Sequence, residues 1–151
     1  MAQGRFITFE GGEGAGKSTQ IARLARRLTE RGLDVVVTRE PGGSERAERI
    51  RSTVLQGAAK ALGPFAEALM FSAARRDHLD KTIRPALARG AVVLCDRFSD
   101  STRAYQGADG GAEPGLIDAL ERVVVEETRP DLTLVLDLPA QEGLARAARR
   151  R

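Results

Sequence analysis

The residues with the clearest chemical potential lie at positions 11–18, directly after the apolar run Phe6–Phe9. Their spacing is that of a phosphate-binding loop: Gly, four residues, then Gly-Lys-Ser. Glycine accepts backbone angles that side chains forbid, so the loop amides can close around phosphate oxygens. Lys17 is a point charge suited to the β- and γ-phosphates of a nucleotide, and Ser18 offers a hydroxyl to Mg²⁺. The residues predicted to hold the phosphates are Gly11, Gly12, Glu13, Gly14, Ala15, Gly16, Lys17, Ser18 and Thr19.

The surroundings of this loop separate a phosphate site from an ordinary glycine turn. A short β-prone run precedes it, and Ile21, Leu24 and Leu28 follow at helical spacing until Gly32, a helix stop. The positive end of that helix dipole would face the same anion. Strand, loop and helix therefore agree on a nucleotide phosphate site.

A second pair of candidates follows the apolar run at residues 91–95. An apolar strand that ends in a carboxylate is what a Mg²⁺-linked aspartate requires, which makes Ser18 and Asp96 the predicted metal residues. Arg97 adds a positive fork at the same sheet edge. Cys95 is expected to be a buried strand residue and not a nucleophile.

The elements that position these residues alternate between strand and helix. Short apolar runs at 6–9, 35–38, 91–95 and 132–136 read as buried parallel strands, with helical stretches between them. This pattern predicts an α/β fold of the P-loop NTPase type, a doubly wound parallel sheet flanked by helices. Ligands of such sheets bind beyond the carboxyl ends of the strands.

A long helix is expected from Pro64 to about Arg89. Phe71 and Arg75 are four residues apart and share one of its faces. Spacing alone would make Phe71 a core residue and Arg75 a surface charge. His78, the single histidine, is expected to be structural or exposed and not catalytic.

Composition places the chain among globular proteins of one domain, residues 1–151. The net charge of +3 is modest, and aromatic residues make up only 4%, so a nucleic-acid partner has little support. No run reaches the length of a membrane span, no signal peptide is recognisable, and one cysteine cannot form an internal disulfide. These features favour a cytoplasmic protein with no membrane partner.

Together the motifs resemble those of bacterial thymidylate kinase. The matching segments are Phe-Glu-Gly-Gly-Glu-Gly-Ala-Gly-Lys-Ser-Thr at 9–19, Thr-Arg-Glu-Pro-Gly-Gly at 38–43, Asp-Arg-Phe…Ser-Thr…Ala-Tyr-Gln-Gly at 96–107 and Pro-Asp-Leu-Thr…Leu-Asp at 130–137. Many proteins share the first segment, whereas the second and the Ala-Tyr-Gln-Gly end are far more specific. The resemblance covers essentially the whole chain.

The resemblance implies transfer of the γ-phosphoryl of ATP to dTMP, with Mg²⁺, in a homodimer packed through helices. It assigns catalytic roles to Lys17, Arg97 and Glu13, with Glu13 also accepting a hydrogen bond from the sugar 3′-hydroxyl. Arg51 and Arg97 would hold the dTMP phosphate. The implied substrate contacts are Glu13, Pro41, Arg51, Phe71, Arg75, Arg97, Ser101, Thr102, Tyr105 and Gln106.

Individual contacts to the nucleoside are also implied by the resemblance. Phe71 would stack on thymine and Arg75 would reach a base carbonyl, the reverse of what spacing alone suggests. Thr102 and Gln106 would contact the base. Tyr105 would crowd the sugar 2′ position and so favour deoxyribose, with Ser101 a weaker candidate for the same wall.

The chain departs from the family pattern in several places. Position 14 is Gly and not basic, which implies arginines from a closing lid, and the candidates are Arg146, Arg149, Arg150 and Arg151. Phe98 stands where Tyr or His is common, and Ala47 where Gly is common. No fifth strand, complete lid or adenine pocket is visible after residue 137, so a fragment of about three quarters of such a kinase is expected.

Two alternatives remain: another P-loop nucleoside or nucleotide kinase, and a nucleotide-binding module without turnover. A regulatory GTPase is disfavoured, because the chain has no asparagine for an Asn-Lys-x-Asp guanine motif and no Asp-x-x-Gly stretch.

Overall fold

The computed structural model describes residues 4–149. Four strands form a parallel sheet in the order β2-β3-β1-β4. The strands are β1 (Arg5–Glu10), β2 (Val35–Arg39), β3 (Val92–Asp96) and β4 (Leu132–Val135). All four were predicted from the sequence to within one or two residues, which confirms the α/β fold with its crossover helices.

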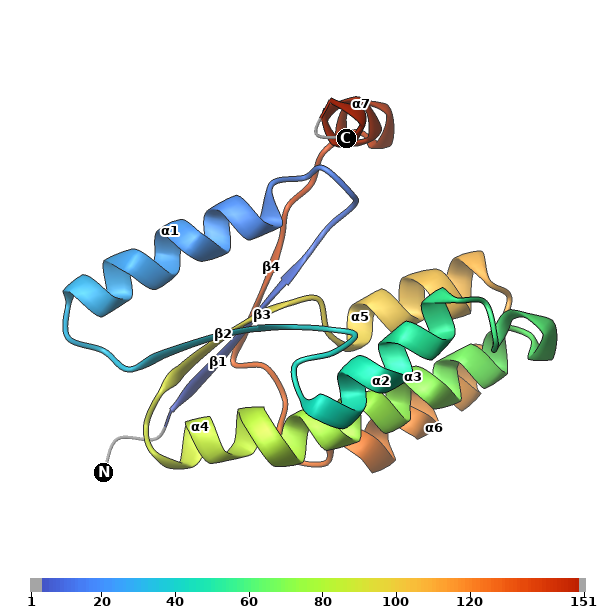
Figure 1. Cartoon of the computed structure of the whole chain (residues 1–151), viewed down its shortest axis with the longest axis horizontal. Helices are drawn as coiled ribbons and strands as arrows, with labels where there is room; N and C mark the ends of the chain where they lie inside the picture. Colours follow the sequence, from blue (N-terminus) through green and yellow to red (C-terminus); the bar gives the residue numbers. More distant parts are fainter. Residues whose placement is uncertain (1–3, 150–151) are drawn as a thin grey trace.

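Helices cover both faces of the sheet (Figure 1). Helix α1 (Lys17–Glu30) lies on one face, and α3 (Pro64–His78), α4 (Arg84–Ala88) and α6 (Pro114–Val125) lie on the other. Helix α2 (Glu45–Leu55) packs on α3, and α7 (Ala140–Ala148) lies near the turn between β1 and α1. The shorter helical segments are η1 (Lys60–Leu62), η2 (Leu79–Ile83), α5 (Ser99–Thr102) and η3 (Arg103–Asp109).

Alternation along the central strands directs their side chains to two separate cores. Phe6 packs with Val93 and Cys95 on the side of α4 and η2. Phe9 and Leu94 instead pack with Ile21 of α1. By the same alternation, the last residues of β1 and β3 are directed to opposite faces. Glu10 contacts the turn at the start of α5, whereas Asp96 contacts α1.

The long helix predicted over residues 64–89 is not uniformly α-helical. It consists of α3, the π-helical η2 and α4 in direct succession. Pro85 has no N–H to donate to the carbonyl of Lys81 one turn earlier. The widened turn at Leu79–Ile83 accommodates this missing bond, and Leu79 and Ile83 themselves are fully buried against β3.

The N-terminus of α6 is capped by a side chain. Glu113 accepts hydrogen bonds from the backbone N–H groups of Gly115 and Leu116, 3.0 and 2.9 Å away. Pro114 occupies the first helical position, where a missing N–H costs nothing.

Over residues 4–149, none of the helices combines the length and the apolar character needed to cross a membrane.

Candidate active site

The glycine-rich loop closes around its own lysine at the carboxyl end of β1. Gly11, Gly14 and Gly16 have φ angles of 141°, 75° and 95°, values that side chains rarely adopt. The ammonium of Lys17 donates to the carbonyl oxygens of Gly11 and Gly12, at 2.8 and 3.0 Å. The backbone thus adopts the curled conformation that the spacing predicted.

The N-terminus of α1 is left free to receive an anion. Its cap residue, Gly16, has no side chain to bond the first N–H groups, and the first turn contains no acidic residue. Burial lowers the pKa of Lys17, and the nearby Arg97 guanidinium lowers it further. Two cations and a helix N-terminus therefore meet at one point, which is an electrostatic setting for a polyphosphate.

Asp96 and Ser18 come together as predicted for a magnesium site. The Ser18 hydroxyl donates to Oδ2 of Asp96 at 3.3 Å, while the buried Oδ1 has no partner among the described residues. Residues 4–149 hold no cluster of three or more His, Cys, Asp or Glu side chains suited to a metal. One hydroxyl and one carboxylate fit Mg²⁺, which takes most of its ligands from water and substrate phosphates.

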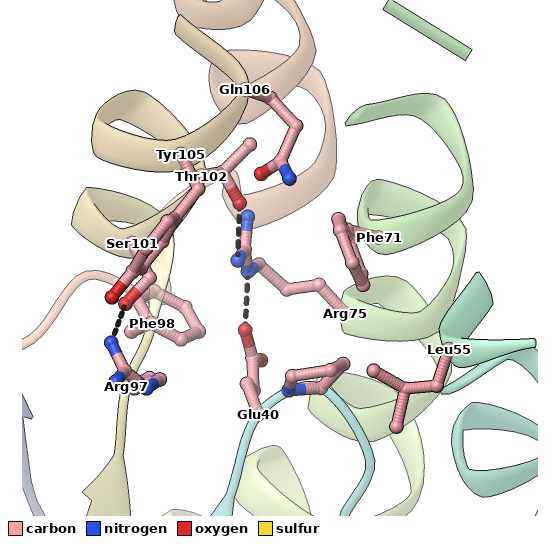
Figure 2. A pocket seen from close by; sticks show the side chains of 11 residues that line it. Glu40, Leu55, Phe71, Arg75, Arg97, Phe98, Ser101, Thr102, Tyr105 and Gln106 are labelled. Atoms are coloured by element: carbon pink, nitrogen blue, oxygen red, sulfur yellow. Dashed lines mark hydrogen bonds and ion pairs between the residues drawn. The ribbon is translucent and has the colours of Figure 1, made fainter. Parts of the chain in front are cut away.

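A cavity of about 300 Å³ lies next to Arg97, between the Pro41 turn, α3 and α5 (Figure 2). Its walls are mainly apolar. The lining residues are Glu40, Pro41, Leu55, Phe71, Arg75, Arg97, Phe98, Ser101, Thr102, Tyr105 and Gln106. Eight of the ten predicted substrate residues are among them, from three separate segments of the chain. Phe71 lines the cavity and is not part of the core clusters.

Arg75 is held rigidly at the floor of this cavity. Its Nε donates to Oε2 of Glu40 at 2.7 Å, and Nη2 donates to the Thr102 hydroxyl at 3.0 Å (Figure 2). Its guanidinium carbon lies 5.0 Å from the ring centroid of Phe98. The prediction from spacing alone that Arg75 is a surface charge is wrong, because its side chain is only 5% exposed.

Arg97 occupies the junction between the cavity and the phosphate loop. Its φ of 70° is left-handed, which costs a non-glycine residue about 1–2 kcal/mol. Its Nη1 donates to the Ser101 hydroxyl at 3.3 Å, and its guanidinium carbon lies 5.3 Å from the centre of the Tyr105 ring. The strained backbone and two side-chain contacts aim this cation into the cavity.

Glu10 is a site residue that the sequence reasoning missed. Its carboxylate accepts from the Phe98 N–H at 2.8 Å and from the Ser101 hydroxyl at 2.7 Å. Burial raises the pKa of Glu10, while these two bonds act in the opposite direction. Glu10 ends β1, and Glu40 directly follows β2. A search for charged residues at strand ends would have found both.

Two predicted substrate residues do not line the cavity. Glu13 is exposed in the phosphate loop, and its carbonyl packs closely on Gly143 of α7. Arg51 is partly buried on α2, and its Nη1 donates to the carbonyl of Pro41, which does line the cavity, at 3.0 Å. Gln106, by contrast, does line the cavity, and its Nε2 donates to Oε2 of Glu67 at 3.5 Å.

The arginines predicted for a lid are only partly described. Arg146 is exposed on α7 and bonds Glu142 one turn away, at 2.6 Å. Arg149 is exposed just after the helix, and Arg150 and Arg151 lie outside the described residues. The predicted buried character of Cys95 is confirmed: it is fully buried, and burial raises the pKa of its thiol.

Comparison with known proteins agrees on one family. The family model described as "Thymidylate kinase" matches residues 9–151. The thymidylate kinase of Caulobacter vibrioides is 65% identical over 150 residues, which are 99% of this chain and 72% of that protein. The thymidylate kinase of Bradyrhizobium diazoefficiens is 60% identical over 149 residues, 99% of this chain and 65% of that protein.

A solved structure carries the same name. The crystal structure of thymidylate kinase from Ehrlichia chaffeensis superposes with a TM-score of 0.83 at 42% identity, over 96% of this chain and 82% of that one. Against the two sequence relatives, this chain spans 72% and 65% of their lengths. With a family model matched over nearly all of the sequence, the chain belongs to the thymidylate kinase family.

Proposed function

We propose that this protein transfers the γ-phosphoryl group of ATP to the phosphate of dTMP, giving dTDP and ADP. Family membership supports this reaction. The observation that carries the proposal is the position of two consecutive residues. Asp96 contacts the phosphate-loop helix through Ser18, and the next residue, Arg97, lines the neighbouring cavity. A phosphoryl donor on the loop and an acceptor in the cavity would meet over this pair.

The donor side is the phosphate loop. Its N–H groups and Lys17 bind the β- and γ-phosphates, and Lys17 leaves the Gly11 and Gly12 carbonyls to do so. Ser18 and Asp96 would hold Mg²⁺, which would neutralise negative charge on the nucleotide phosphates when bound. The partnerless Oδ1 of Asp96 supports this assignment.

The acceptor side is the cavity. Phe71 supplies an aromatic face for the thymine ring, and Arg75, which can only donate hydrogen bonds, suits a base carbonyl. Thr102 and Gln106 complete the polar edge. The opposite wall belongs to Tyr105, which with Ser101 limits the space near the sugar 2′ position.

The acceptor phosphate is held by cations on both sides. Arg97 contacts it and stabilises the charge that develops as one of its oxygens attacks the γ-phosphorus and the bond to the β-phosphate oxygen breaks. Arg51 approaches from α2 beside Pro41. Glu13 accepts a hydrogen bond from the sugar 3′-hydroxyl, and Arg146 and Arg149 approach the transferred group from a lid.

The remaining features of the proposal concern the protein as a whole. We infer that residues 1–151 act as one nucleoside monophosphate kinase domain. The protein works as a cytoplasmic homodimer, packed through the helices on the α3 and α6 side. Apolar side chains that are exposed there, such as Leu69 and Val123, support an interface.

A coupled assay of ADP release tests the proposal. With ATP, Mg²⁺ and dTMP, the full chain should release ADP, and Lys17→Ala should abolish that release because the loop loses its phosphate cation. Arg27→Ala, an exposed arginine on the last turn of the same helix, is the matched control and should remain active. ADP release that is equally fast without dTMP, or with dGMP in its place, would contradict the substrate assignment.

A further inference from the structure

A buried polar cluster lies directly under the cavity, where apolar packing would be expected. The side chains of Glu40, Arg75 and His78 are 5%, 5% and 0% exposed. Charged groups are rarely buried to this extent unless each has a partner. The cluster also joins two segments, because Glu40 follows β2 and the other two residues lie one turn apart on α3.

The hydrogen bonds fix which ring nitrogen of His78 carries the proton. Nδ1 lies 3.0 Å from Oε1 of Glu40, and a carboxylate only accepts, so Nδ1 is the donor. Nε2 lies 2.7 Å from the Thr38 hydroxyl, which donates to it when the ring is neutral. A side chain at Gly43 would overlap the imidazole, so the glycine there reserves space for the ring.

The chain of contacts continues from His78 through Glu40 to Arg75. Each Glu40 oxygen has one partner: His78 on Oε1 and Arg75 Nε on Oε2. Arg75 Nη2 is taken by Thr102. Within residues 4–149, Nη1 is the guanidinium nitrogen without a protein hydrogen bond. Since Arg75 lines the cavity, this contact pattern leaves Nη1, whose direction is fixed by the contacts of the other two nitrogens, to donate to a ligand.

We propose that His78 is a positioning residue for nucleobase recognition. It does not line the cavity; it acts by locking Glu40, which in turn sets the rotation of Arg75. This inference rests on the proposed function, in which Arg75 donates to a base carbonyl. A donor fixed in this way favours binding of thymine or uracil, which carry a carbonyl. It disfavours cytosine, which carries an amino group at the same ring position.

Equilibrium binding to the full chain tests the proposal without requiring turnover. Calorimetry would give the Kd values of dTMP, dUMP, dCMP and a non-hydrolysable ATP analogue. His78→Leu should weaken dTMP and dUMP by about tenfold, the loss of roughly one charge-assisted hydrogen bond. The preference for dTMP over dCMP should shrink by a similar factor, and binding of the ATP analogue should be unchanged.

Two further variants protect the test from a folding defect. His78→Asn keeps an N–H near the Nδ1 position and should restore most of the dTMP affinity. Thr38→Val keeps the shape of Thr38 but removes the hydroxyl that holds Nε2, so the ring is less firmly oriented toward Glu40, and the expected loss is about threefold, somewhat less than one hydrogen bond. Thr82→Val is the matched control, because it deletes a 2.7 Å bond to the Gly43 carbonyl in the same loop without touching Glu40.

The outcomes separate the two proposals. If the wild-type chain binds dTMP and dCMP equally weakly, the proposed function itself is wrong. If the wild-type chain prefers dTMP and His78→Leu and Thr38→Val keep that preference, the positioning role is overturned. A preference that Thr82→Val reduces as much as His78→Leu does would also overturn it, because loop anchoring in general would then be the cause.

Discussion

Substituting alanine for Gly143 should have opposite effects on helix α7 and on the phosphate loop. In a helix, alanine is favoured over glycine by about 1 kcal/mol. A Cβ at Gly143, however, would lie closer to the Glu13 carbonyl oxygen than real Cβ atoms come, and that oxygen belongs to the backbone. The loop must therefore move by several tenths of an ångström. Overpacking of this kind costs about 1–3 kcal/mol, so we expect a net destabilisation of about 0–2 kcal/mol.

The larger effect should be on nucleotide binding. The displaced segment contains the N–H groups that are proposed to bind the phosphates, and small displacements of positioning groups are costly. We expect Gly143→Ala to weaken a non-hydrolysable ATP analogue by about tenfold in calorimetry, a sensitivity of the kind seen for misplaced positioning groups. Gly115→Ala on α6 is the matched control, since its Cβ would meet only the flexible Glu113 carboxylate. A Gly143→Ala variant with a higher Tm and unchanged affinity would refute the reasoning.

Two other expectations follow from buried titratable groups. Because burial raises the pKa of Glu10 above its ordinary 4.5, the folded state holds that proton more tightly than the unfolded state, so the contribution of Glu10 to stability is lost as pH rises. The unfolding free energy of wild type should therefore fall relative to Glu10→Gln as the pH rises above about 4.5, and a flat or rising difference in denaturant titrations would contradict this. At about pH 8, the buried Cys95 thiol should resist a thiol reagent in the native protein and should react fully in denaturant. Rapid labelling without denaturant would count against its burial.

Local pattern was sufficient to predict the strands and the phosphate loop. The run before Gly11 is apolar and β-prone, and the helix after it has clear 3.6-residue spacing, so the two signals agree. The Asp96 position followed from the same logic. Most of the cavity wall was also predicted, but through the family resemblance and not from local pattern, since Phe71, Arg75 and Tyr105 all line the cavity.

Features that depend on contacts between residues far apart in the chain could not be predicted from local sequence patterns. On its helix, Arg75 looks like a surface charge, because its partners Glu40 and Thr102 are 35 and 27 residues away. The same holds for His78, whose buried bonds come from Thr38 in β2 and from Glu40 directly after that strand. The backbone hydrogen bonds of the π-helical η2 span one residue more than those of an α-helix, and hydrophobic spacing does not resolve that difference.

The strand order has a consequence for how this protein could change its substrate. The loop and the aspartate that are proposed to bind the donor phosphates follow or end the two central strands, β1 and β3, whereas most of the cavity wall comes from α3, α5, η3 and the loop after β2. Arg97 is proposed to serve both regions. Exchange of side chains on the two helices could therefore redirect the choice of nucleobase while the transfer machinery stays intact. Such a division makes the scaffold evolvable, and it marks α3 and α5 as the elements to randomise in a search for new acceptors.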